Sequence, residues 1–193
     1  IGHRGVKNLS PENTLNSIKL AKNLGLRWVE IDVKISKDLV PIAIHDDTLE
    51  RTTNGKGLPI NFNYDDIRKL DAGSFFYDYS TNIYIPSLKE VLLLCQQNKI
   101  GLNIELKPNL GFEKKNVEAI LKVLNELGID IKYYISSFDL DSLILMSEVL
   151  PNAYYGLLIN EFDKYINLKN VLDICHKYNF FSCGLNKKII SLE

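Results

Sequence analysis

Charged side chains alternate with apolar ones in three short segments of the sequence. Glu30 and Asp32 stand two positions apart in one apolar run, and Glu105 and Lys107 do the same in a later run. Alternate residues of a β-strand point to opposite faces, so each pair shares one face of its strand. His45 ends a third segment with the same alternation. We therefore expect these five side chains on one face of a sheet, toward the C-terminal ends of its strands.

Glu30, Asp32 and Glu105 are the carboxylates of this set. Three carboxylates gathered at one place repel one another unless a cation neutralises them. A ligand set made only of oxygens, with no cysteine, suits a hard divalent ion better than zinc or copper. The sequence thus predicts one bound divalent cation, Mg²⁺ or Ca²⁺. The alternative is that the three charges line the solvated face of a half-exposed antiparallel sheet, which would show the same alternation.

Two of the three histidines fall at the ends of predicted strands. His3 is followed by Arg4 near the start of the sequence, and His45 follows a strand-like segment. Two histidines beside a cation suit phosphodiester cleavage, because one can deprotonate the nucleophile and the other can protonate the leaving alkoxide. Arg4 and Lys107, with the metal, would offset the charge of the phosphoryl group. His176 lies within a predicted helix and is not expected to take part.

Strand-like and helix-like segments alternate along most of the chain, and they must position these side chains. The predicted strands are Ile1–Gly2, Trp28–Val33, Val40–His45, Ile100–Lys107, Tyr133–Phe138, Ala153–Ile159 and Phe180–Leu185. The predicted helices run from a Ser10-Pro11 start to Gly25, from a capping box at Ser87, over Val117–Leu124 to Gly128, over Asp139–Leu150 and over Asn167–Tyr178. Repeated βα alternation predicts a parallel sheet covered by helices. An open doubly wound sheet and a closed (β/α)₈ barrel both fit, although no glycine-rich nucleotide-binding motif supports the open form.

Residues 46–86 interrupt this alternation. We expect them to form an insertion after the third strand that lies over one mouth of the barrel, with a short helix near Tyr64–Leu70. The insertion also holds an aromatic group, Phe75, Phe76, Tyr77 and Tyr79. No linker separates it from the rest, so residues 1–193 are expected to form a single catalytic domain.

The composition narrows the choice of partners. The chain has 193 residues with 23 Lys and Arg against 24 Asp and Glu, a formal net charge of −1. Nucleic-acid binding normally needs an excess of basic residues, so we expect a small-molecule substrate and no nucleic acid. No apolar run approaches the roughly 20 residues that cross a bilayer, and no signal-peptide pattern is present. These features predict a cytoplasmic protein without a transmembrane segment, and they leave its oligomeric state open.

In the order and spacing of its motifs, the sequence resembles the glycerophosphodiester phosphodiesterases. The matching strings are His3-Arg4-Gly5, Pro11-Glu12-Asn13-Thr14, Glu30-Ile31-Asp32-Val33, His45-Asp46, Arg51-Thr52-Thr53 with Gly55 and Gly57, Ile85-Pro86-Ser87-Leu88 and Asn103-Ile104-Glu105-Leu106-Lys107. The resemblance is close from Ile1 to about Lys107 and looser at Ser136-Ser137-Phe138 and Gly156-Leu157-Leu158.

This resemblance implies a (β/α)₈ barrel that uses a divalent metal to hydrolyse glycerophosphodiesters to glycerol 3-phosphate and an alcohol. It assigns the metal ligands to Glu30, Asp32 and Glu105, the acid/base pair to His3 and His45, and the phosphate contacts to Arg4 and Lys107. By the same resemblance, Glu12 and Asn13 buttress the first loop, and Asp46 orients His45 or its loop. Head-group preference, the choice between Mg²⁺ and Ca²⁺, and attack by water or by the neighbouring glycerol hydroxyl, through a cyclic phosphate, stay open.

The sequence departs from the family pattern in two places. Asp38 is followed by Leu39 where the family usually has glycine, which is expected to alter a turn. The family's Trp-Thr-Val-Asn-like last strand has no counterpart, and 193 residues fall short of the roughly 250 of a full barrel. We therefore expect a barrel that lacks its last strand and a sequence that is part of a longer chain. A lysophospholipase D-type enzyme and a non-catalytic binding barrel are the alternative functions.

Overall fold

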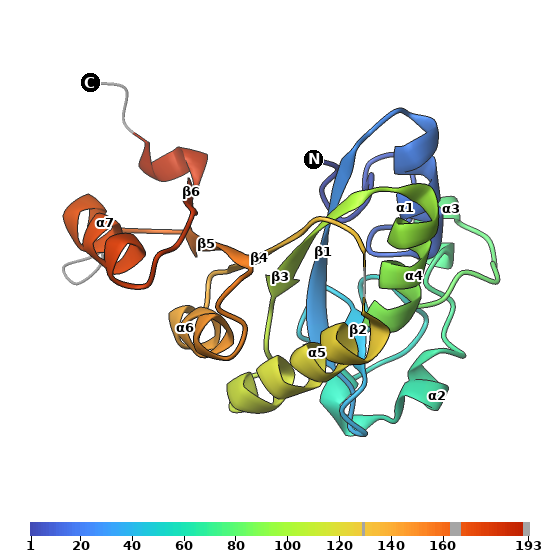
Figure 1. Cartoon of the computed structure of the whole chain (residues 1–193). Coiled ribbons are helices and arrows are strands. Elements are labelled where there is room, and N and C mark those ends of the chain that lie inside the picture. The colour runs from blue at the N-terminus through green and yellow to red at the C-terminus, as the bar shows by residue number, and fades with distance from the viewer. Residues whose placement is uncertain (129, 163–166, 191–193) are drawn as a thin grey trace.

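The structure, a computed structural model, describes residues 1–128, 130–162 and 167–190. A six-stranded sheet with the order β2-β1-β3-β4-β5-β6 forms its centre (Figure 1). The strands are β1 (Trp28–Ile35), β2 (Pro41–Ala43), β3 (Gly101–Leu106), β4 (Tyr133–Ser137), β5 (Tyr154–Ile159) and β6 (Ser182–Leu185). All neighbours from β1 to β6 pair in parallel, which confirms the α/β class. The predicted first strand is reduced to one parallel bridge between Gly2 and Val29.

The third predicted strand differs from the prediction. Val40–His45 was expected to be a barrel strand like the others, but β2 is shorter and pairs antiparallel with β1. The connection from Ile35 to Pro41 is too short for a parallel crossover, which needs about a dozen residues. The chain turns back instead, and Leu39 adopts a left-handed φ of 61° in this turn. A glycine would meet this φ at lower cost, so Leu39 places some strain in the turn.

Helices follow the sheet from α1 and α4 near β1 to α7 near β6 (Figure 1). The helices are α1 (Leu15–Asn23), α2 (Tyr64–Ile67), α3 (Ser74–Tyr77), α4 (Leu88–Asn98), α5 (Glu113–Leu127), α6 (Leu140–Val149) and α7 (Leu168–Lys177), with 3₁₀ turns η1 (Pro59–Asn61) and η2 (Lys187–Ile189). The predicted capping box of α4 is present, with reciprocal bonds between Ser87 and Glu90. Gly128 ends α5, as the sequence predicted, and it adopts the left-handed conformation. None of the described helices is both long and apolar enough to cross a membrane.

Helix α1 begins later than the predicted start at Ser10-Pro11. Thr14 caps it by accepting a hydrogen bond from the Ser17 N–H. Asn13 has a left-handed φ of 57°, so a regular helix cannot run through it. Its side chain is used elsewhere, as described below. The predicted end of the helix is confirmed, because Gly25 has a φ of 80° and its N–H bonds to the Lys22 carbonyl.

The buried apolar face of β1 and β3 packs against the helices, as the alternation predicted. Val29, Ile31 and Val33 of β1 belong to the same buried cluster as Leu102 and Ile104 of β3. The insertion has a smaller core of its own, formed by Ile42, Ile44, Leu49, Ile67, Ala72 and Ile85. Strands β1 and β3 pair in parallel, and β1 is buried on both faces from Val29 to Ile35, which excludes a solvated antiparallel sheet.

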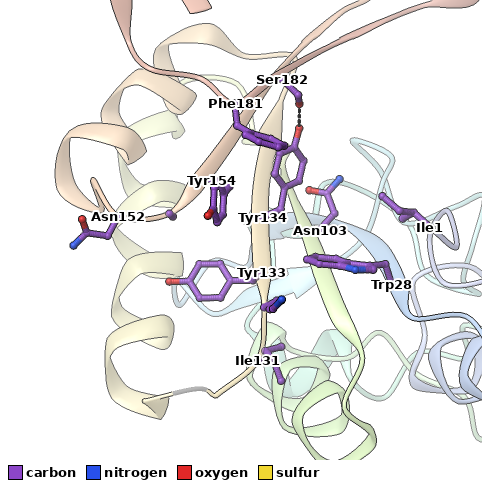
Figure 2. A pocket seen from close by; sticks show the side chains of 12 residues that line it. Ile1, Trp28, Asn103, Ile131, Tyr133, Tyr134, Asn152, Tyr154, Phe181 and Ser182 are labelled. Carbon is purple, nitrogen blue, oxygen red and sulfur yellow. Dashed lines mark hydrogen bonds between the residues drawn. The ribbon is translucent and has the colours of Figure 1, made fainter.

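Strands β2 and β6 are the two edges of the sheet, and no pairing joins them among the described residues. The predicted barrel that lacks its last strand agrees with this open sheet. A cavity of about 670 Å³ lies between Trp28, Tyr134, Tyr154 and Phe181 (Figure 2). The Tyr134 hydroxyl lies 2.6 Å from Ser182 Oγ on its wall. The cavity is largely apolar, and none of the predicted site residues lines it.

Candidate active site

Glu30, Asp32 and Glu105 meet on the polar face of β1 and β3. Asp32 lies beside Glu105 in the parallel register, and Glu30 precedes Asp32 by one alternation. One carboxylate oxygen from each residue can be chosen so that all three lie within 4.8 Å of one another. All three side chains are buried. The predicted triad is therefore assembled, and it is compatible with a divalent metal.

The electrostatics of the triad favour a bound cation. Burial and the nearby Asp32 charge raise the pKa of Glu30 to about 8. The same two causes, burial first, raise the pKa of Glu105 to about 7. Within the described part of the chain, Glu30 Oε1 and Asp32 Oδ1 are buried without a hydrogen-bond partner. A hard cation would supply these oxygens with a ligand bond and remove the mutual repulsion, so the residues fit such an ion.

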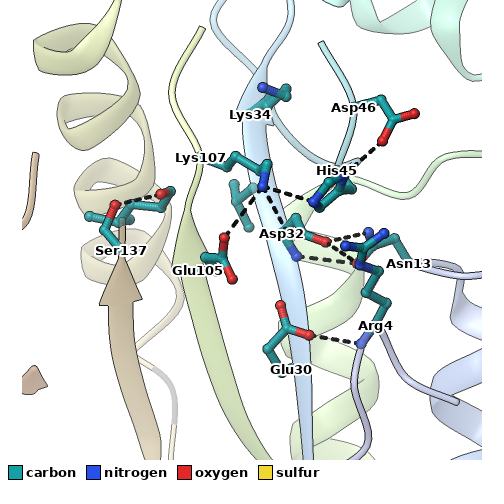
Figure 3. Close-up of polar contacts among 12 residues, drawn as sticks. Arg4, Asn13, Glu30, Asp32, Lys34, His45, Asp46, Glu105, Lys107 and Ser137 are labelled. Carbon is teal, nitrogen blue, oxygen red and sulfur yellow. Dashed lines mark hydrogen bonds and ion pairs between the residues drawn. The ribbon is translucent and has the colours of Figure 1, made fainter. Parts of the chain in front are cut away.

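The loop after Gly2 folds against the triad through Arg4. The Arg4 backbone N–H donates to Glu30 Oε2 at 2.8 Å, and its Nε lies 3.2 Å from Asp32 Oδ2 (Figure 3). Asn13 donates its side-chain amide to Asp32 Oδ2 at 2.9 Å and accepts from the Asp32 N–H at 3.2 Å. The left-handed φ of Asn13 directs the chain so that these two bonds form. Both residues thus hold metal-ligand candidates in place, and Asn13 has the buttressing position that the resemblance implied.

His3 approaches the triad from this loop. Its Nε2 lies 3.7 Å from Glu30 Oε2, and half of its side chain is exposed. Burial of the ring and the positive charges of Lys7 and Arg4 lower the pKa of His3. The ring is therefore close enough to the carboxylates, and open enough to solvent, to exchange protons with a bound molecule.

His45 approaches from the end of β2 and is held on both ring nitrogens. Its Nδ1 lies 2.6 Å from Asp46 Oδ1, and its Nε2 lies 2.8 Å from Lys107 Nζ (Figure 3). Lys107 Nζ is also 3.6 Å from Glu105 and 3.9 Å from Asp32. A carboxylate only accepts and an ammonium only donates, so this network assigns the ring proton to Nδ1. The structure therefore brings together all seven predicted site residues.

Two polar residues of the site received no role from the sequence. Lys34 is fully buried and donates to Asp47 Oδ1 at 2.8 Å. It follows Glu30 and Asp32 in the same alternation, so the pattern could have predicted that Lys34 shares their strand face. Arg51 bonds to both Glu12 and Asp46. In the sequence, Arg51 appeared only as part of the matched Arg51-Thr52-Thr53 string. No local pattern could pair it with Glu12, which lies 39 positions away.

A second cavity of about 670 Å³ opens beside three of the predicted site residues. His45, Glu105 and Lys107 contribute to its wall, together with Leu110 and Phe138. Leu110 is 96% exposed and Phe138 is 50% exposed. The aromatic group of the insertion, residues 75–79, is absent from this wall. The apolar side of the mouth therefore comes from the loops after β3 and β4.

Comparisons with known proteins show which family the chain resembles. Residues 3–181 match the glycerophosphoryl diester phosphodiesterase family. A glycerophosphodiester phosphodiesterase of Caldanaerobacter subterraneus subsp. tengcongensis is 37% identical over 82% of this chain and 65% of its own length. One from Bacillus altitudinis is 34% identical over 98% of this chain and 78% of its own length.

Solved structures give the same result. An Oleispira antarctica phosphodiesterase in complex with the product sn-glycerol-3-phosphate aligns with a TM-score of 0.87 and 32% identity, over 98% of this chain and 75% of that one. A glycerophosphodiester phosphodiesterase from Thermotoga maritima aligns with a TM-score of 0.74 and 28% identity, over 96% and 72%. The family match covers most of the chain and the fold aligns with solved relatives, so the chain belongs to the glycerophosphoryl diester phosphodiesterase family.

Proposed function

We propose that this chain hydrolyses glycerophosphodiesters to glycerol 3-phosphate and an alcohol, with one Mg²⁺ or Ca²⁺ held by Glu30, Asp32 and Glu105. The observation that carries the proposal is the buried carboxylate triad, with unpartnered oxygens, beside the paired His45 and Lys107. The Oleispira antarctica relative, which binds sn-glycerol-3-phosphate as its product, supports the glycerol phosphate half of the substrate.

The side chains of the site divide the reaction between them. When bound, the cation would withdraw charge from the phosphoryl oxygens. Arg4 and Lys107 add two positive charges at the same place, where charge develops in the transition state. His3 and His45 act as the acid and base on the nucleophile and the leaving alkoxide. Asp46 keeps the proton of His45 on Nδ1, so that Nε2 is the atom that exchanges a proton.

Variants of these residues test the proposal. His45→Ala and Glu105→Gln should each reduce glycerol 3-phosphate release from glycerophosphocholine by at least about 100-fold, since each removes a group needed in the transition state. The matched control is His176→Ala, because His176 is exposed on α7. Full activity of His45→Ala, or an equal loss in His176→Ala, would contradict the proposed site. Detection of a cyclic glycerol phosphate during turnover would then distinguish a cyclic phosphate route from direct water attack.

A lysophospholipid substrate is the second candidate, and the exposed Leu110 and Phe138 favour it. Both line the cavity that holds His45 and Lys107, where an acyl chain could lie against them. If so, lysophosphatidylcholine should be cleaved faster than glycerophosphocholine, and Leu110→Ser should slow only the lipid reaction. Equal effects on both substrates would leave the small glycerophosphodiester as the substrate.

A further inference from the structure

Arg51 joins the two loops that carry the predicted catalytic histidines. Its Nε and Nη2 donate to the two carboxylate oxygens of Asp46 at 2.6 and 2.8 Å. Its Nη1 and Nη2 donate to the two oxygens of Glu12 at 2.9 and 2.7 Å. One guanidinium therefore forms a two-bond fork with each of two carboxylates, which fixes their planes as well as their positions.

The carboxylates of Asp46 and Glu12 each contact a predicted site residue. Asp46 bonds to Nδ1 of His45 at 2.6 Å, and Glu12 accepts from Arg4 Nη1 at 2.8 Å. Arg4 in turn lies 3.2 Å from the metal-ligand candidate Asp32. A continuous series of polar contacts thus runs from His45 to Asp32, and Arg51 joins its two halves. Since Arg51 belongs to the insertion, this series also gives the insertion a part in the site.

The contacts of Arg51 differ from those of an ordinary surface ion pair. Arg68, an equally exposed arginine of the same insertion, contacts Glu90 through one nitrogen at 3.4 Å. For Glu12, burial would raise the pKa, but the bonds from Arg51 and Arg4 lower it to about 2. The bonds from Arg51 are the largest cause that keeps the pKa of Asp46 well below its usual range. Both carboxylates therefore remain ionised acceptors over the whole range in which the enzyme would work.

We propose that Arg51 is a positioning residue for the hydrolysis. It orients Asp46, so that His45 keeps its proton on Nδ1 and presents Nε2 to the bound substrate. It also orients Glu12, so that Arg4 stays against the phosphate side of the triad. This role rests on the proposed function, but the orientation of His45 can be measured without turnover.

The kinetic test compares Arg51→Gln with Arg68→Gln in the full chain. Arg51→Gln should lower kcat for glycerophosphocholine by about 10- to 100-fold, as is usual when the partner of a reacting group is lost. KM should change less than kcat, and Arg68→Gln should behave like the wild type. Arg51→Lys should fall between, because an ammonium keeps the charge but not the two forks. Arg51→Ala should regain part of its kcat in millimolar guanidinium chloride.

The second readout is the ring nitrogen spectrum of His45, assigned by its loss in His45→Ala. Wild type should show the Nδ1–H tautomer in ¹⁵N NMR, and Arg51→Gln should shift toward a mixture of tautomers. Unchanged kcat or an unchanged tautomer in Arg51→Gln would overturn the proposal. The proposal would also be overturned if the variants lose kcat in proportion to their fall in melting temperature and guanidinium chloride restores none of it. If Arg51→Gln fails to fold, the same two measurements on Arg51→Lys decide. An inactive wild type would contradict the proposed function. The tautomer measurement would still test whether Arg51 orients His45.

Discussion

The fold strongly disturbs the ionisation of Glu30, and this gives a test of the metal site. Its pKa is raised to about 8 by burial and by Asp32, whereas an unfolded chain would titrate it near 4.3. The folded, metal-free state therefore becomes less stable as the pH rises between these two values. We expect the metal-free chain to lose on the order of 2 kcal/mol of unfolding free energy between about pH 5 and pH 8.

Urea unfolding in chelator at several pH values measures this loss. Glu30→Gln should flatten the pH dependence, because glutamine cannot ionise, and a saturating divalent cation should do the same in the wild type. Glu118→Gln, at an exposed position of α5, is the control and should leave the dependence unchanged. A wild type whose stability rises steadily from pH 5 to pH 8 would contradict the buried, uncompensated triad.

At this scale the sequence predicted which charged side chains lie together. Alternation alone placed Glu30, Asp32 and Glu105 on one face, and the parallel register then brought their oxygens together. Arg51 was left without a role because its importance comes from contacts made across loops. Such contacts leave no periodic trace in the sequence, in contrast to side chains that share a strand face.

Among the elements, the insertion depends on one buried carboxylate. Asp71 accepts hydrogen bonds from the backbone N–H groups of Gly73, Ser74 and Thr81 and from two hydroxyls. Burial alone would raise the pKa of Asp71, but these bonds, that of the Thr81 side chain first, lower it to about 2. Asp71→Asn should cost about 2 kcal/mol, since its amide group would face donors with a further donor.

The pH dependence checks the same carboxylate. Because its folded pKa is lowered, its stabilising effect is complete above about pH 4 and disappears as the pH falls toward 2. Denaturant unfolding at pH 7 and at low pH should therefore show a gap between wild type and Asp71→Asn that narrows in acid. Asp173→Asn, an exposed change on α7, should stay within about 0.5 kcal/mol of wild type. A gap that persists at pH 2 would contradict this explanation.

Element types were more predictable than their exact starts and partners. The capping box at Ser87 and the glycine ends at Gly25 and Gly128 are local signals, and the structure confirms them. The antiparallel β2 and the late start of α1 depend on chain reversal at Leu39 and on Asn13 reaching Asp32. Tertiary contacts decide these features, so periodicity could not predict them.

For the whole molecule, a metal on β1 and β3 should stabilise the entire fold, because these strands lie within the sheet. A divalent cation at 100 times its Kd should add about 2.7 kcal/mol to the unfolding free energy. Trp28, the only tryptophan, lies in the same strand as Glu30 and reports on it. The unfolding midpoints measured by its fluorescence and by far-UV circular dichroism should therefore rise together on adding metal. Both midpoints should return together with chelator. A shift in only one of the two signals would contradict a metal that supports the whole sheet.

Release of glycerol 3-phosphate from glycerophosphocholine by this chain would test the proposed metal-dependent hydrolysis. The assay is run in chelator and again after Mg²⁺ or Ca²⁺ is restored in excess. We expect no measurable release in chelator and steady release with at least one of the two ions. Release that chelator leaves undiminished would contradict the metal role of Glu30, Asp32 and Glu105. No release from a folded chain with the cation bound would contradict the proposed hydrolysis itself.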